Sequence, residues 1–270
     1  LPKRKEFHYF SRPYLERSIA GPGDAAVLAG IPKNLNNYLR HYPTQSDGRI
    51  NVEISPSYLF HHGSAMAIAR DLPGVKVVFM LRQPEDKVFS QYVHLVGEGR
   101  ETLSFEAALD AEAGRKVEGY SDIWLYAESG YYSDAVAAFQ EVLGRERVKV
   151  LLFDDFRRDP SAVLHTLCLF AGLDGSQSFN TALQANVSGM PRSVWLARSM
   201  APNSFTNLLR RLLPARLGQI ARRVLRKLNT GAKPELASGT RAALRARYIR
   251  DIQRLEELIG RETGWLRSKD

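Results

Sequence analysis

The sequence predicts an α/β fold in which a central parallel sheet is flanked by helices. Two apolar runs carry this prediction, because residues 75–81 and 147–153 are short and rich in β-branched and aromatic residues. Each run is followed by a segment of helical character, and an amphipathic helix is predicted over 134–143, ending at Gly144. The chain of 270 residues is long enough for one sizeable core of this kind.

The composition is that of an ordinary globular protein with a basic balance. The net charge of +9 suits an anionic cofactor, an anionic glycan, nucleic acid or a membrane surface, and does not choose among them. The single Cys168 excludes an intrachain disulfide framework and a cysteine zinc cluster, and favours a reducing, cytoplasmic compartment. No apolar run approaches the roughly 20 residues of a membrane span, and no signal-peptide pattern opens the sequence.

The segment from 75 to 94 combines a strand with a helix that carries polar side chains. Arg82 stands at the carboxyl end of the predicted strand, the edge where α/β sheets bind ligands, and Pro84 suits the first turn of a following helix. Ser90 lies on a helix face away from the predicted core positions. A guanidinium, a hydroxyl and a nearby helix start suit a phosphate. The alternative is that Arg82 forms a surface ion pair with Glu85 or Asp86 and Ser90 is an ordinary helix residue.

The run LRQPEDKVFSQYVH resembles the 3′-phosphate-binding segment of PAPS-dependent sulfotransferases, which reads roughly L-R-x-P-x-x-R-x-x-S-x-Y-x-H. The matching residues are Leu81, Arg82, Pro84, Ser90, Tyr92 and His94, and Lys87 stands where arginine is usual. The resemblance implies that Arg82 and Ser90 hold the 3′-phosphate of PAPS, with PAP as the product. It also implies the three-layer fold of these enzymes, which is similar to that of P-loop nucleotide kinases.

The first residues carry the candidate general base. By themselves, residues 3–10 indicate a short strand or an extended basic segment with aromatic anchors. The segment resembles the K-E-x-x-F-F run of the same family, with Lys5, Glu6 and Phe10 matching. The resemblance implies that Glu6 takes the proton of the attacking acceptor hydroxyl, a role that a positioned carboxylate can fill. His8 is the alternative base.

The family binds the 5′-phosphosulfate with a loop like K-x-G-T-T/S, whose backbone N–H groups cradle the phosphate. The sequence shows no substitute, since the glycines at 20–24 and 172–175 lie beside acidic residues and no Lys-Ser/Thr pair follows them. Residue 1 is leucine rather than methionine. We therefore expect a trimmed N-terminal portion, with the loop upstream; a real loss would put catalysis in doubt.

Residues 50–60 predict a short strand, a Ser-Pro turn and then a helix over 62–70. The segment resembles the family's E-K/A-S/T-P-x-Y-L/F run, which lines the acceptor site, and this implies substrate contacts from Glu53, Ser55 and Tyr58. Ile54 replaces a lysine that is common in glycan-modifying members. The loss of this cation makes a strongly anionic glycan a less favoured acceptor. The alternative is a buried strand end with Ser55 capping the helix.

Two further candidates concern the substrate and the nucleotide. Tyr120 and Trp124 could stack on a sugar or ring of the acceptor, although aromatic residues at this spacing more often pack in a core. Arg192 lies in a late loop resembling the family's N-x-S-x-x-P-R run, which implies a contact with the 3′-phosphate. The acids that follow the second strand, Asp154 and Asp155, could bind a metal; we expect no metal, because sulfuryl transfer of this kind uses none.

We predict a single sulfotransferase domain over residues 1–270, with a basic helical C-terminal portion from about 195. Residues 208–228 are rich in leucine and arginine and could touch a membrane surface or pack on the domain. The predicted enzyme is bacterial and cytoplasmic, and moves a sulfuryl group from PAPS to a hydroxyl or amine of a glycan or small molecule. The alternatives are a P-loop-type kinase and a non-catalytic basic module that binds nucleic acid or membrane.

Overall fold

The computed structural model describes residues 5–42, 50–176, 179–181, 231 and 234–267. The elements formed by these residues are η1 (Tyr9–Ser11), α1 (Arg12–Leu15), α2 (Asp24–Gly30), α3 (Leu35–Leu39), α4 (Ser57–Phe60), α5 (Ser64–Asp71), β1 (Val77–Leu81), α6 (Pro84–Gly97), α7 (Phe105–Asp110), α8 (Glu112–Glu118), η2 (Asp122–Trp124), η3 (Glu128–Gly130), α9 (Ser133–Leu143), η4 (Arg145–Arg147), β2 (Val148–Leu152), α10 (Phe153–Arg158), α11 (Pro160–Ala171) and α15 (Ser238–Ile259).

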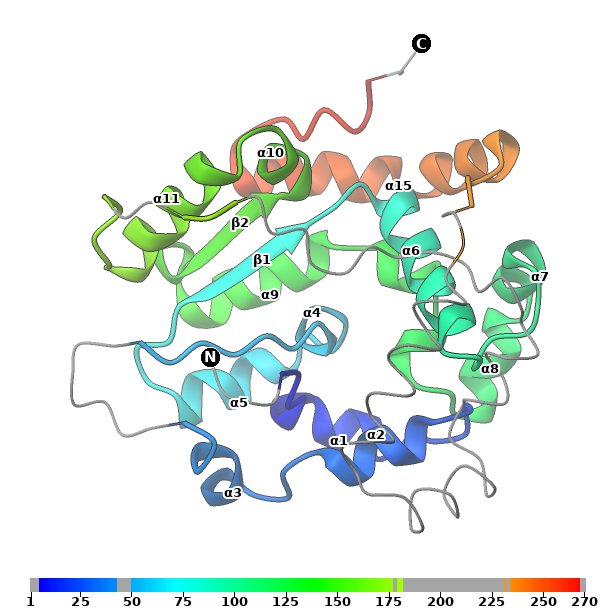
Figure 1. Ribbon diagram of the computed structural model, residues 1–270, viewed down its shortest axis with the longest axis horizontal. Coiled ribbons are helices and arrows are strands. Elements are labelled where there is room, and N and C mark those ends of the chain that lie inside the picture. Colours follow the sequence, from blue (N-terminus) through cyan, green and yellow to red (C-terminus); the bar gives the residue numbers. More distant parts are fainter. Residues whose placement is uncertain (1–4, 43–49, 177–178, 182–230, 232–233, 268–270) are drawn as a thin grey trace.

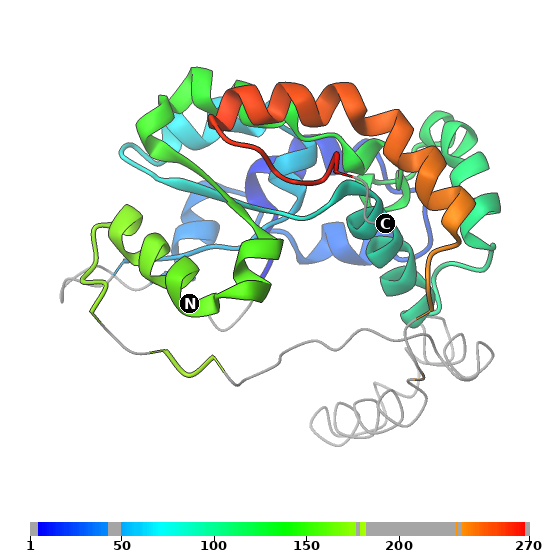
Figure 2. The same ribbon diagram turned by 90° about the horizontal axis from the view of Figure 1, so that it is seen from above.

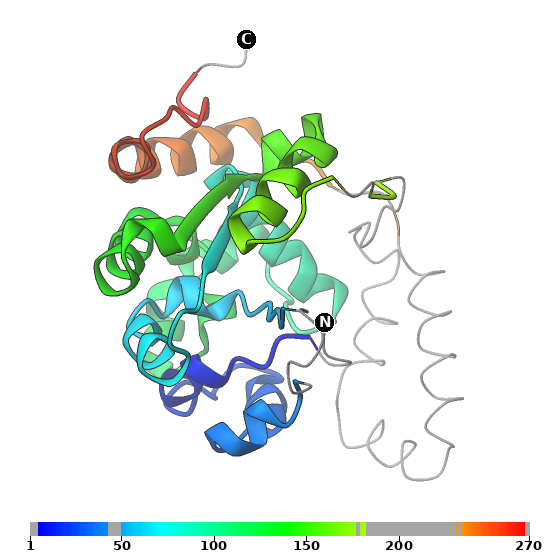
Figure 3. The ribbon, with the colours of Figure 1, turned by 90° about the vertical axis from the view of Figure 1, so that its left-hand side faces the viewer.

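The two apolar runs form parallel strands, and these are the strands found among the described residues. β1 pairs with β2 in a register that runs from Val77 opposite Val148 to Leu81 opposite Leu152. Helices lie on both sides of this sheet (Figures 1 and 3), with α9 on one side and α11 on the other. The predicted α/β class with a parallel, helix-flanked sheet is therefore confirmed.

The helices begin and end where the sequence provides the appropriate residues. The Ser104 side chain accepts a hydrogen bond from the Ala107 N–H at 3.3 Å, so it caps α7. Gly144 ends α9 and Gly172 ends α11, both with positive φ, which glycine adopts without steric cost.

The long helix α15 closes the core from the C-terminal side. It packs on α9 and α6 (Figure 2), and buries Tyr248, Ile252 and Leu255. Trp265, just beyond it, is buried and donates from Nε1 to Asp154 Oδ2 at 2.9 Å. Asp154 therefore fixes the chain after β2 by holding the buried Trp265. Within the described residues, no group of His, Cys, Asp or Glu side chains could hold a metal ion.

Two predicted local structures differ from those observed. Residues 50–55 form no strand, and a short helix that was not predicted, α4, follows the Ser-Pro turn; the helix predicted over 62–70 is present as α5. A strand needs a partner for its backbone groups, but a cavity separates this segment from β1. Ile50, Val52 and Ile54 consequently remain 40%, 42% and 48% exposed.

The first described residues are also irregular rather than extended as a strand. Glu6 and His8 have φ values of 60° and 53°, and no other non-glycine residue of the described part has a positive φ. This left-handed backbone costs about 1 kcal/mol or more for an ordinary side chain and breaks any strand. Phe7 and Phe10 are nevertheless buried in the core, as aromatic anchors.

Some predictions fall on residues that the structure does not describe. Arg192 and the basic segment 208–228 lie outside the described residues, so their roles remain predictions. The single domain over 1–270 also remains a prediction. Within the described part, no helix combines the length and the apolar composition needed to cross a membrane.

Candidate functional site

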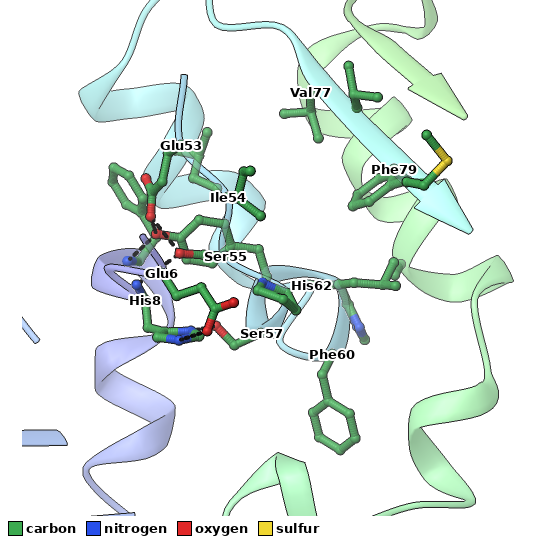
Figure 4. A pocket seen from close by; sticks show the side chains of 18 of the residues that line it. Glu6, His8, Glu53, Ile54, Ser55, Ser57, Phe60, His62, Val77 and Phe79 are labelled. Atoms are coloured by element: carbon green, nitrogen blue, oxygen red, sulfur yellow. Dashed lines mark hydrogen bonds and ion pairs between the residues drawn. The ribbon is translucent and has the colours of Figure 1, made fainter. Parts of the chain in front are cut away.

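A large cavity opens between β1 and the residues that precede α5 in the chain. Its volume is about 1930 Å³, and its walls include β1 on one side and residues 50–60 on the other. Figure 4 shows the polar side chains gathered on the second wall, with Val77 and Phe79 of β1 across from them. Predicted site residues that line this cavity are Lys5, Glu6, His8, Glu53, Ser55, Tyr58 and Arg82. Residues far apart in the sequence thus reach one space.

Glu6 and His8 form an acid and imidazole pair at this wall. His8 Nε2 lies 3.9 Å from Glu6 Oε2, and the Glu6 side chain is 55% exposed whereas that of His8 is largely buried. On its other side, His8 Nδ1 shares a hydrogen bond of 2.7 Å with Ser57 Oγ. A solvent-accessible carboxylate beside a held imidazole is able to accept and pass on a proton.

The backbone of His8 is held by the same group of hydroxyls. The His8 N–H donates to Ser55 Oγ at 3.0 Å, and Ser11 Oγ donates to the His8 carbonyl at 3.1 Å. Ser57 and Ser11 share a hydrogen bond of 2.6 Å. These bonds maintain the left-handed conformation at His8, and strained residues of this kind concentrate at functional sites.

Glu53 is the centre of a hydroxyl cluster. Its Oε1 accepts from Ser55 Oγ at 2.6 Å and from Tyr58 OH at 2.7 Å, and its Oε2 accepts a short hydrogen bond from Tyr38 OH. Burial raises the pKa values of Tyr38 and Tyr58, and the Glu53 charge raises them further, so both phenols stay protonated donors. With three donors already bound, Glu53 is suited to hold the Ser55 turn rather than to accept a proton.

Arg82 occupies the predicted position at the carboxyl end of β1. Its guanidinium lies over the Phe153 ring, 5.6 Å from the centroid, and Arg82 Nη2 lies 3.5 Å from Asp86 Oδ2. Tyr132 OH donates to the Arg82 carbonyl at 2.9 Å, which fixes the backbone. The Asp86 pair is the ion pair of our alternative interpretation, but it is long, and the side chain remains 26% exposed on the cavity wall.

The helix after Arg82 contributes polar side chains to the cavity wall, but Ser90 is not one of them. Lys87, Gln91 and His94 of α6 line it, whereas half-buried Ser90 is not among its lining residues. The Lys87 ammonium donates to the Ser129 carbonyl at 2.7 Å, and burial lowers the pKa of this amine to about 7. Ser90 is close to Arg82 in the sequence, but in the structure it does not line the cavity that Arg82 lines.

The two aromatic candidates for acceptor stacking lie away from this cavity. Trp124 is almost fully buried and donates from Nε1 to Asp24 Oδ1 at 3.0 Å. Tyr120 packs edge-to-face against it at 5.5 Å between ring centroids. This is the core packing that we named as the alternative, so the acceptor interpretation of Tyr120 and Trp124 has no geometric support.

Comparisons with known proteins decide the family. A model described as "Sulfotransferase family" matches residues 19–177, more than half of the chain. This chain belongs to the sulfotransferase family. A crystal structure of a sulfotransferase from Alicyclobacillus acidocaldarius has 30% sequence identity and a TM-score of 0.75, covering 98% of this chain and 87% of that one. Among curated proteins, none matches by sequence.

Membership of this family supports an activity that transfers sulfuryl groups. The matched residues, 19–177, include Glu53, Arg82 and Ser90. It begins after Glu6, so the base candidate rests on the short resemblance and on its geometry.

Sequence reasoning missed several residues of this sulfotransferase's site. Tyr38, Ser57 and Phe153 are brought in by tertiary contacts, and no local pattern marks them. Lys87 carried a signal, because it stands where the family segment that this sequence resembles has arginine, but its burial could not be predicted from the sequence.

Proposed function

We propose that this sulfotransferase moves the sulfuryl group of PAPS to a hydroxyl or amine of a glycan or small molecule, and releases PAP. The observation that carries the proposal is the shared cavity: Arg82 lines it at the end of β1, and the Glu6–His8 pair lines it on the facing wall. An anion anchor and a proton acceptor in one space suit transfer of a charged group.

In this proposal, Arg82 binds the 3′-phosphate, because a guanidinium offers paired N–H donors to phosphate oxygens. The acceptor oxygen attacks sulfur while the bond between sulfur and the 5′-phosphate oxygen breaks, and the leaving PAP keeps the electron pair. Glu6 takes the acceptor proton, with His8 as orienting partner or as the base itself. Such an in-line transfer depends on positioning and on positive charge rather than on covalent chemistry with the protein.

The 5′-phosphosulfate needs hydrogen-bond donors of its own, and the open edge of β1 offers room for them. Within the described residues, β1 is paired on one edge only, and its other edge faces the cavity opposite Ile50, Val52 and Ile54. A further strand in this space would satisfy the open backbone groups of β1 and cover these exposed apolar side chains.

Nucleotide binding tests the proposal directly. PAP should raise the melting temperature of a protein that includes any upstream sequence, and Arg82→Ala should remove most of this effect. ATP with Mg²⁺ serves as the control nucleotide, since a larger effect of ATP would favour the kinase alternative. Absence of PAP binding by the longer protein would refute the proposal.

The proton acceptor is tested separately. Glu6→Gln should retain PAP binding and lose sulfuryl transfer, because the amide holds no proton-accepting charge. His8→Asn tells whether the imidazole is the base or the partner. If Glu6→Gln turns over as fast as wild type, Glu6 is not the base.

A further inference from the structure

Arg82 shares its carboxylate neighbour with a second arginine. Asp86 lies in the first turn of α6, and Arg241 of α15 donates from Nη1 to Asp86 Oδ1 at 2.8 Å. The distance from Arg82 Nη2 to Asp86 Oδ2 is longer, at 3.5 Å. The tighter partner of Asp86 is therefore the arginine from the C-terminal helix, more than 150 residues away in sequence.

A carboxylate next to a phosphate-binding arginine competes with the phosphate for the same N–H donors. Burial raises the pKa of Asp86, but the hydrogen bond from Arg241 and the charges of Arg82 and Arg241 outweigh it and lower the pKa. Asp86 is consequently negative at neutral pH. Among the described residues, Asp86 forms ion pairs with Arg82 and Arg241. If Arg241 were removed, Arg82 would be the cation that remains beside Asp86.

We propose that Arg241 is a positioning residue for the nucleotide: it holds the Asp86 carboxylate toward α15, and so leaves the Arg82 guanidinium available to the 3′-phosphate. This inference rests on the proposed function, in which Arg82 binds that phosphate. Arg241 acts through Asp86 and does not need to touch the nucleotide.

The spacing between the two arginines is fixed by other contacts of α15. Asp251 accepts hydrogen bonds from the Tyr132 N–H at 2.8 Å and from the Ser133 N–H at 3.0 Å. Tyr132 in turn binds the Arg82 carbonyl through its hydroxyl. The helix that carries Arg241 is thus tied to the backbone of Arg82, which makes a stable division of Asp86 between the two cations feasible.

A double-mutant cycle tests this role, with affinities for PAP and for adenosine 5′-monophosphate, which lacks the 3′-phosphate. Arg241→Ala should weaken PAP binding about fivefold, as expected for freeing one half-buried ion pair, and leave the monophosphate unchanged. In the Asp86→Asn background, Arg241→Ala should have no effect on PAP. Arg241→Lys should restore most of the affinity, because it can still hold Asp86.

Two controls separate this role from a structural one. Arg254→Ala removes an exposed arginine of the same helix, paired with Asp134, and should not change PAP binding. Arg241→Gln serves as a second variant if Arg241→Ala lowers the melting temperature. Equal weakening of both nucleotides, or the same loss of PAP affinity in the Asp86→Asn background, would overturn the inference.

The outcome for Arg82→Ala keeps the two proposals apart. If Arg82→Ala abolishes the preference for PAP while Arg241→Ala leaves the affinity for PAP unchanged, the positioning role fails and the proposed function stands. If wild type shows no preference for PAP, or keeps it in Arg82→Ala, the proposed function fails and the positioning role falls with it.

Discussion

The buried amine of Lys87 makes the stability of this protein depend on pH. Lys87 lies on α6 at the cavity wall, and its ammonium donates to the Ser129 carbonyl at 2.7 Å. Burial lowers its pKa from 10.5 to about 7, against opposition from the charges of Asp122 and Glu112. Lys87→Met keeps the length and apolar character of the side chain while removing the titrating group.

The direction of the pH effect follows from the number of protons that Lys87 binds in the folded and in the unfolded chain. Below about pH 7 both the folded and the unfolded chain bind the proton, and the buried charge costs stability in full. Above this pH the folded protein releases the proton while the unfolded chain keeps it, so stability rises by at most about 1.4 kcal/mol per pH unit. Between about pH 7.5 and about pH 9.5, this group should add about 2.5 kcal/mol to the free energy of unfolding of wild type.

Urea unfolding at a series of pH values measures this difference. The wild type should gain stability relative to Lys87→Met as pH rises, and the variant should be the more stable protein near neutral pH. Lys33→Met, which removes an exposed lysine, is the control and should run parallel to wild type. Parallel curves for wild type and Lys87→Met would refute the reasoning, since they would show that Lys87 has the same pKa in both states.

Two further predictions concern stability. Glu53→Gln should lower the free energy of unfolding by about 2–3 kcal/mol in urea titrations, because three hydroxyl donors lose a charged acceptor. The control Glu6→Gln changes an exposed carboxylate and should alter the free energy of unfolding by less than about 0.5 kcal/mol. Equal effects of the two substitutions would contradict the stabilising role of the hydroxyl cluster around Glu53. Gly130→Ala should lower the free energy of unfolding by about 1–3 kcal/mol, because the new Cβ would lie 2.5 Å from the ring of the buried Tyr248. The control Gly239→Ala has open space around the new Cβ and should leave stability unchanged or raise it. An unchanged stability of Gly130→Ala would show that α15, which carries Tyr248, can shift.

The strands and most helices could be predicted from the sequence, because their signals are local. The runs that became β1 and β2 are apolar in the way that buried strands must be, and Ser104 and Gly144 mark helix ends through their own backbone preferences. Residues 50–55 show where this approach fails. Their alternation is that of a strand, yet strand structure also needs a partner, and the cavity leaves them without one.

The order of residues was enough to predict the family resemblance, the parallel α/β class and the place of Arg82 at a strand end. Tertiary structure decided which side chains meet there. Only the packed chain could bring Glu6 and His8 to the wall facing Arg82, surround Glu53 with hydroxyls from Tyr38 and Tyr58, and set Trp124 into the core. It also gave Asp86 a second arginine from α15. The physical reason is that hydrogen bonds, ion pairs and burial depend on distance in space, and distance in sequence does not determine it.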